Sequence, residues 1–166
     1  AIAASDSVLD QIGSEGDTGD TTNSVVTVAQ LGDILGLTDI VAGNETAYQD
    51  YIDSNPDLFS TPATLAEVQA MIDTVNASEA AKAASNAVLS QIGLEADDPD
   101  SVNSIVTIAQ LGAILPALTD INSTHETAYQ DYIDANPDAF ESPATPAEVQ
   151  AMVDAVNAEQ AAIAAS

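Results

Sequence analysis

The chain has 166 residues, of which 27 are Asp or Glu and one is Lys or Arg, so its formal net charge is −26 at neutral pH. Binding to phosphate backbones or anionic lipid needs clustered basic side chains, so this composition excludes nucleic acid and disfavours anionic membrane surfaces as partners. Cysteine is absent, which excludes disulfides and thiolate metal sites. No apolar run approaches the roughly 18 residues of a membrane span, so we expect no membrane insertion.

The chain repeats its own sequence with a period of about 80 residues. Residues 5–35 recur as 85–115, and after one extra residue near Pro116 the offset becomes 81. The opening AIAAS (1–5) also recurs as 162–166. The repeat predicts two domains, 1–81 and 82–166, and we expect the chain to be a segment of a longer array whose partners are neighbouring repeats.

Segment 13–26 and its counterpart 93–106 are the least regular part of each period. Carboxylate and amide oxygens at short spacings in a loop are the ligands that Ca²⁺ prefers. The EF-hand pattern is missing, so two interpretations stay open: loops that bind Ca²⁺, or solvated acidic loops. The candidate ligands are Glu15, Asp17, Asp20 and Asn23 in the first period, and Glu95, Asp97, Asp98, Asp100 and Asn103 in the second.

Capping boxes of the form S/T-x-x-E/Q predict where helices begin. Thr27 and Thr107 each begin one, with Gln three residues later. In the first copy the apolar positions Val28, Leu31, Ile34 and Leu35 follow, and we expect the helix to end at Gly36. In the second copy, Pro116 is expected to end it.

The phrase ETAYQDYID predicts a short helix that ends before Pro56. Its tyrosine pair, Tyr48 and Tyr51 (Tyr129 and Tyr132 in the second period), supports two interpretations: core packing with a hydroxyl in solvent, or an exposed protein-binding face. The single Phe of the next turn, Phe59 or Phe140, is expected to fill the core.

Two further capping boxes start at Thr64 and Thr145. From Leu65 no Gly or Pro occurs until Gly93, and the middle is rich in Ala, so we predict one helix from Leu65 to Ile92. The alternative is a break near Asn76. The fold class predicted is all-α: two tandem small helical bundles of three to four helices each, joined by a long Ala-rich helix.

No catalytic constellation accompanies the titratable side chains. Asp50 and Asp53 are interpreted as surface carboxylates of a helix, and His125 is replaced by Asn44 in the first period. Lys82 corresponds to Ile2 and Ile163, which favours a side chain lying along a helix over a catalytic base. We therefore predict that the chain is not an enzyme and holds no catalytic cofactor.

The phrases ATLAEVQAMIDTVNA (63–77), ATPAEVQAMVDAVNA (144–158) and TVAQLGDILG (27–36) resemble repeat modules of very large secreted bacterial surface proteins, the adhesin and RTX-type giants. The resemblance implies an extracellular location at the bacterial cell surface and a role as one unit of a long stalk. Such proteins often bind calcium, although the RTX pattern G-G-x-G-x-D does not occur here.

Two functional hypotheses follow. The first is a structural extender repeat that spaces the parts of a long acidic adhesin-like protein. The alternative is a small helical protein-binding module that presents a duplicated surface to a host or matrix partner.

Overall fold

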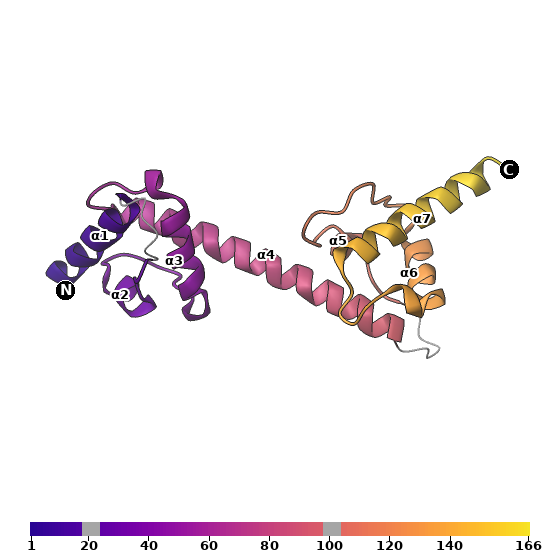
Figure 1. Ribbon diagram of the computed structural model, residues 1–166, viewed down its shortest axis with the longest axis horizontal. Helices are drawn as coiled ribbons and strands as arrows, with labels where there is room; N and C mark the ends of the chain where they lie inside the picture. The colour runs from indigo at the N-terminus through magenta and orange to yellow at the C-terminus, as the bar shows by residue number, and fades with distance from the viewer. Residues whose placement is uncertain (18–23, 98–103) are drawn as a thin grey trace. The chain divides into compact units, whose positions relative to one another are not determined.

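The computed structural model describes residues 1–17, 24–97 and 104–166, and in these ranges all regular secondary structure is helical (Figure 1). The predicted all-α class is therefore confirmed. The backbone divides into two compact units, Ala1–Glu79 and Ala80–Ser166, which are called unit 1 and unit 2 below. The expected domain boundary between residues 81 and 82 stays a prediction.

Unit 1 is built from helices of very different length. They are α1 (Ile2–Asp17), α2 (Val28–Asp33), the 3-10 helix η1 (Ala42–Asn44), α3 (Glu45–Ser54), the 3-10 helix η2 (Pro56–Leu58) and the first half of α4 (Leu65–Asp97). Helix α1 contacts α2, α3 and η2. Each α-helix contributes apolar side chains to one core, which includes Val8, Ile12, Leu31, Tyr48, Ile52, Val68, Met71 and Ile72.

Unit 2 uses the second half of α4, followed by α5 (Ile108–Leu111), α6 (Glu126–Ala135), the 3-10 helix η3 (Pro137–Ala139) and α7 (Pro146–Ala164). Helix α6 packs on α7. The core of this unit includes Val88, Ile92, Leu111, Ile114, Tyr129, Ile133, Val149, Met152 and Val153.

Helix α4 is a single helix of 33 residues. The uninterrupted helix predicted from Leu65 to Ile92 is therefore confirmed, and the alternative break near Asn76 is wrong. Alanine has the highest helix propensity, so the Ala-rich middle stays helical although its side chains lie outside both cores. The stripe that begins at Val68 packs in the core of unit 1, and the stripe that resumes at Val88 packs in the core of unit 2.

The capping boxes predicted the helix starts correctly. The Thr27, Thr107 and Thr145 side chains accept the backbone N–H three residues later, and the N3 side chain bonds back to the cap. The same pair of bonds joins Thr64 and Glu67. The two phenylalanines, Phe59 and Phe140, are buried, with 5% and 6% of their surface exposed, as expected.

Helix α3 ends at Ser54, before Pro56, as predicted, but the predicted ends of α2 and α5 were wrong. Helix α2 ends at Asp33 and α5 at Leu111, before Gly36 and Pro116, and Leu35 is exposed rather than part of an apolar stripe. Beyond each helix end, a buried serine accepts a backbone N–H. The Leu35 N–H donates to Ser5 Oγ at 3.2 Å, and the Leu115 N–H donates to Ser85 Oγ at 2.8 Å.

The acidic segments also begin later than expected. Helices α1 and α4 continue through Gly13 and Gly93 to Asp17 and Asp97, so Glu15, Asp17, Glu95 and Asp97 belong to helices and not to irregular loops. The glycines do not end the helices; they permit a close approach of another backbone segment. A Cβ at Gly13 would lie 2.7 Å from the Ala63 nitrogen, and one at Gly93 would lie 2.6 Å from the Glu141 carbonyl oxygen.

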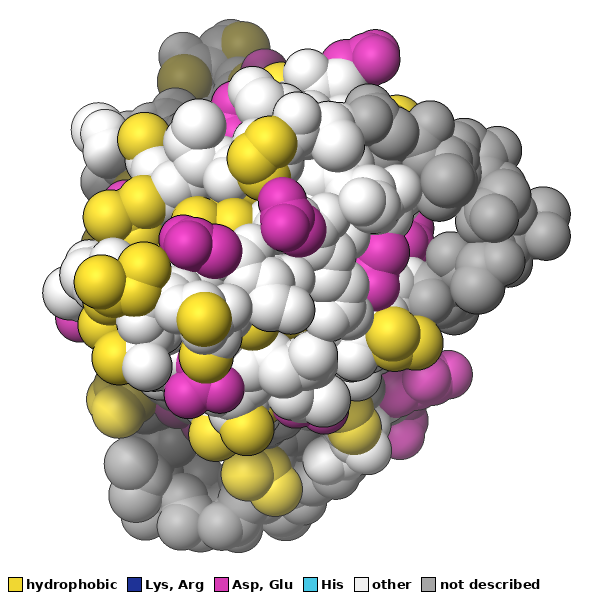
Figure 2. All heavy atoms as spheres, turned by 90° about the vertical axis from the view of Figure 1, so that its left-hand side faces the viewer, with side chains coloured by type: hydrophobic (Ala, Val, Ile, Leu, Met, Phe, Trp, Pro, Cys, Tyr) yellow, Lys and Arg dark blue, Asp and Glu magenta, His cyan; other side chains and the backbone are white. Residues whose placement is uncertain are grey.

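The surface is acidic where the structure describes it. Figure 2 shows Asp and Glu side chains scattered over one face, with separate hydrophobic side chains between them. With 27 acidic residues and one basic residue in the chain, most of these carboxylates can be balanced only by ions from solution.

Candidate functional site

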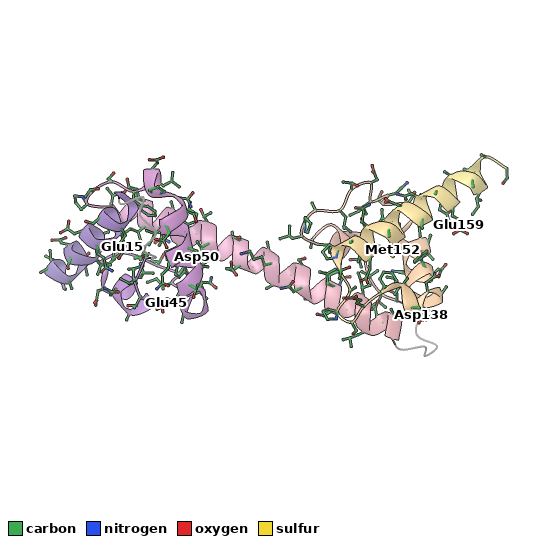
Figure 3. The ribbon with its side chains drawn as sticks, viewed as in Figure 1. Glu15, Glu45, Asp50, Asp138, Met152 and Glu159 are labelled. Carbon is green, nitrogen blue, oxygen red and sulfur yellow. The ribbon has the colours of Figure 1, made fainter. Side chains whose placement is uncertain are left out.

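The carboxylates beside the acidic segments form the first candidate site. Glu15 lies on α1 (Figure 3), where its carboxylate accepts the Gln11 side-chain amide at 2.9 Å and the Ser24 hydroxyl. Glu95 makes the same pair of bonds with Gln91 and Ser104. The two ends of each acidic segment are thus joined by one carboxylate.

A second carboxylate, which the sequence interpretation treated as an ordinary surface group, holds the same serine. Both carboxylate oxygens of Asp53 accept the Ser24 N–H, at 2.7 and 2.9 Å. Asp134 and Ser104 repeat this arrangement at 2.8 and 3.1 Å. The sequence signal that could have revealed this contact is that both periods contain the Asp (Asp53, Asp134) and the Ser (Ser24, Ser104).

The remaining predicted ligands lie at the ends of two helices or outside the described residues. Asp17 and Asp97 occupy the last positions of α1 and α4. Asp20, Asp98 and Asp100, together with Asn23 and Asn103, lie outside the described residues. Among the side chains that the structure describes, which do not include those of Asp17 and Asp97, no group of three or more Asp, Glu or His is placed to hold a metal ion. Glu15 and Glu95 supply oxygen donors of the kind that suits Ca²⁺, and the calcium interpretation stays a prediction.

The tyrosine pair is divided between two environments. Tyr48 is fully buried, and its hydroxyl donates to Asn76 Oδ1 at 2.6 Å and accepts the Val41 N–H at 3.0 Å. Tyr51 is half-buried and meets Phe59 edge to face, with ring centroids 6.5 Å apart. Core packing of Tyr48 is therefore confirmed, but its hydroxyl bonds to an asparagine instead of reaching solvent.

The only histidine in the chain takes a structural position. In unit 1 the Asn44 side chain donates to Asn76 Oδ1 at 2.9 Å, and in unit 2 His125 Nδ1 lies 2.8 Å from Asn157 Oδ1. An amide oxygen such as Asn157 Oδ1 can only accept hydrogen bonds, and it also accepts one from the Tyr129 hydroxyl. His125 Nδ1 therefore carries the proton in this contact. Histidine thus replaces asparagine as a hydrogen-bond donor.

Glu67, in the first turn of α4, has a strongly perturbed acidity. Hydrogen bonds from the Ser60 hydroxyl at 2.6 Å and from the Thr64 N–H at 2.7 Å lower its pKa to about 2. Its counterpart Glu148 has Glu141 in place of that serine. Partial burial opposes ionisation of Glu148, but N–H groups of Thr145 and Glu141 donate to its carboxylate and lower its pKa.

Beside Glu67 lies the second candidate site, a shallow groove of about 290 Å³ between α3, η2 and α4. Phe59 and Met71 form its buried floor, and Leu58, which is 52% exposed, forms one wall. The complete lining is Tyr51, Leu58, Phe59, Ala66, Glu67, Ala70 and Met71. In unit 2 the same positions carry Tyr132, Ala139, Phe140, Ala147, Glu148, Ala151 and Met152, so the leucine wall is reduced to alanine.

Comparisons of the chain with protein-family models, with curated proteins and with solved structures find no match. Across the described residues, no helix combines the length and apolar character needed to cross a bilayer. The function of the chain therefore has to be inferred from its geometry and its physical chemistry.

Proposed function

We propose that the chain is a structural extender: two tandem helical-bundle modules, 1–81 and 82–166, of a long acidic protein at the bacterial cell surface. It would act as a stalk spacer, with neighbouring repeats of the same chain as its partners. This proposal joins the internal repeat with the resemblance of its helical phrases to the repeats of secreted surface proteins.

One observation carries the proposal. Helix α4 contributes Val68, Met71 and Ile72 to the core of unit 1 and Val88, Leu89 and Ile92 to the core of unit 2, and its backbone is helical between them. A connection made of regular hydrogen-bonded backbone restricts motion far more than a Gly- or Ser-rich linker of equal length. Such a connection suits a spacer protein better than a protein whose two domains close around a ligand.

The charge supports the same role. A net charge of −26 keeps parallel copies of such a chain apart and soluble. Because screening by salt weakens this repulsion, the fold is best suited to a medium that contains salt or divalent cations, as an extracellular location would provide.

The experiment measures whether α4 holds a fixed separation. The chain lacks cysteine, so Asp57→Cys and Asp138→Cys, at equivalent exposed positions of the two units, can carry a unique pair of spin labels. We expect one narrow distance distribution in the labelled chain. Adding Ala81→Pro at an exposed position of α4 should broaden it, because proline removes a backbone hydrogen bond and breaks a helix interior, whereas Ala81→Ser should leave it narrow. A broad distribution in the chain without a change at Ala81 contradicts the extender.

The alternative, a binding module with a duplicated surface, has a specific observation in its favour. Two pairs of equivalent side chains remain exposed: Val25 and Ile105, at 64% and 68%, and Leu35 and Leu115, at 52% and 44%. This candidate predicts that the chain binds an extracellular-matrix protein and that the double variant Val25→Ser, Ile105→Ser loses this binding. Interferometry against a panel of immobilised matrix proteins would test it, and equal binding by both chains would contradict it.

A further inference from the structure

We propose that the groove of unit 1 binds an apolar side chain carried by a basic peptide segment. This inference does not depend on the extender function. It concerns one face of unit 1 that unit 2 does not reproduce.

The shape of the groove selects a single side chain. Ala66 and Ala70 lie one helical turn apart on α4 and have small side chains, Met71 is buried, and Leu58 is half exposed. Pockets for small-molecule ligands usually enclose about 300–1,000 Å³. This groove, at about 290 Å³, lies just below that range. Its dimensions suit one leucine-sized or phenylalanine-sized group, whose burial would also cover Leu58.

The negative charge at the rim of the groove favours basic residues on either side of the apolar residue in the bound peptide. Glu67 lines the groove and is ionised at neutral pH. Its Oε2 accepts the N–H groups of Ser60 and Thr64, at 3.1 and 2.7 Å, and its Oε1 accepts the Ser60 hydroxyl. These hydrogen bonds hold a negative charge at the rim of the groove, and that charge attracts the cationic side chain of arginine or lysine.

A second copy of the chain is a poor occupant. It would bring 27 carboxylates and one basic side chain toward a rim that is already negative. A basic segment instead gains from the field of the whole chain, which attracts it from a distance and is weakened by salt. Because an exposed ion pair contributes little affinity, the apolar side chain must supply most of the binding and the charges most of the selection.

Unit 2 provides the matched control within the same molecule. Its groove positions are identical except that Ala139 replaces Leu58, so the apolar wall is absent while the glutamate, Glu148, is retained. Each unit also contains one of the two methionines of the chain, Met71 in unit 1 and Met152 in unit 2. Met152 is labelled on α7 in Figure 3. Methionine methyl groups labelled with ¹³C therefore report on the two positions separately.

The test titrates the labelled full chain with acetyl-Arg-Leu-Arg-amide and follows both methyl signals by NMR. We expect the Met71 signal to shift and saturate while the Met152 signal stays nearly still. Acetyl-Arg-Ala-Arg-amide and acetyl-Glu-Leu-Glu-amide should each move Met71 much less, since one lacks the apolar side chain and the other the positive flanks.

Two substitutions test directly whether the Leu58 side chain contributes to peptide binding. Leu58→Ala should weaken peptide binding at Met71 by roughly fivefold or more, because part of the buried apolar area is lost; since Leu58 is half exposed, this variant should remain folded. Ala139→Leu should make the Met152 signal respond. The proposal is overturned if Met71 does not shift at millimolar peptide, if the alanine peptide shifts it equally, or if both substitutions leave the two responses unchanged.

Discussion

The Tyr48 hydroxyl donates to Asn76 Oδ1 across 2.6 Å and thereby joins α3 to α4 inside unit 1. Asn76 in turn donates its amide to the Asp39 carbonyl at 2.7 Å, so one side chain connects two helices and the segment before them. Tyr129, Asn157 and Asp120 form the same chain of bonds in unit 2, at 2.9 and 2.8 Å. These polar groups satisfy one another where the helices meet, which fixes the position of each tyrosine ring in its core.

Tyr48→Phe should destabilise the fold. The substitution removes one of two donors to Asn76 Oδ1, which keeps the Asn44 amide, and it removes the acceptor of the Val41 N–H at a part-buried place. We expect a loss of about 1–3 kcal/mol in the free energy of unfolding, measured by urea denaturation. Tyr51→Phe, at a half-buried ring, is the control and should cost less. Equal losses from the two variants would contradict a structural role for the Tyr48 hydroxyl.

Ser60→Ala should raise the pKa of Glu67 and change the response of the fold to acid. A carboxyl group whose pKa is lowered by folding stabilises the native state above its unfolded pKa, and this contribution disappears as pH falls from about 4.5 toward about 2. Without the Ser60 hydroxyl the native pKa lies closer to the unfolded value, so less stability is lost over that range.

Titration of the Glu67 side-chain carbon by NMR measures this pKa directly. Glu148 lacks a serine partner and provides the comparison within the chain, since its pKa should be unaffected by Ser60→Ala. A Glu67 pKa that does not change in the variant would show that the hydroxyl is not what lowers it.

Gly13→Ala and Gly93→Ala should each destabilise the fold, by about 1–3 kcal/mol or more, because the added methyl group meets fixed backbone atoms. Gly32→Ala is the matched control: it lies inside α2, where an added methyl group would meet no other segment within 4 Å, and should stabilise by about 0.5–1 kcal/mol. Thermal unfolding followed by circular dichroism distinguishes the two signs. If all three substitutions changed the melting temperature in the same direction, the close backbone approach at Gly13 and Gly93 would not be the reason that these positions need glycine.

Added NaCl should raise the melting temperature of the chain, because screening weakens the mutual repulsion of its carboxylates. CaCl₂ at matched ionic strength tests the calcium interpretation of segments 13–26 and 93–106. A gain from Ca²⁺ well beyond that from NaCl, reversed by EDTA, would support specific sites, and equal gains would support solvated acidic loops. Mg²⁺ at the same concentration is the control for divalent charge alone.

The sequence by itself determined the helical class and most helix starts. Capping boxes at Thr27, Thr107 and Thr145 are local devices, in which a side chain bonds a backbone group three residues away, so they act before any tertiary contact. The long helix through Ala77 and Lys82 was predictable for the same reason, since Ala-rich sequence without Gly or Pro favours a helix wherever it lies. The burial of Phe59 also followed from composition, because few other large rings were available.

Tertiary structure decided where α2 and α5 end and which polar side chains form hydrogen bonds between distant segments. Helix α2 ends at Asp33, and the Leu35 N–H beyond it donates to Ser5, 30 residues away. Gly13 lies inside α1, where another backbone segment passes close to it. The repeat shows that the Asp and the Ser occur in both periods, but only the tertiary structure shows that Asp53 bonds to Ser24 and that a groove lies beside Leu58, because each depends on distant segments meeting in space. Local hydrogen bonds and helix propensity depend on neighbouring residues, so the sequence predicts them. The ends of α2 and α5, the hydrogen-bonded carboxylates and the surface groove depend on distant segments that only folding brings together.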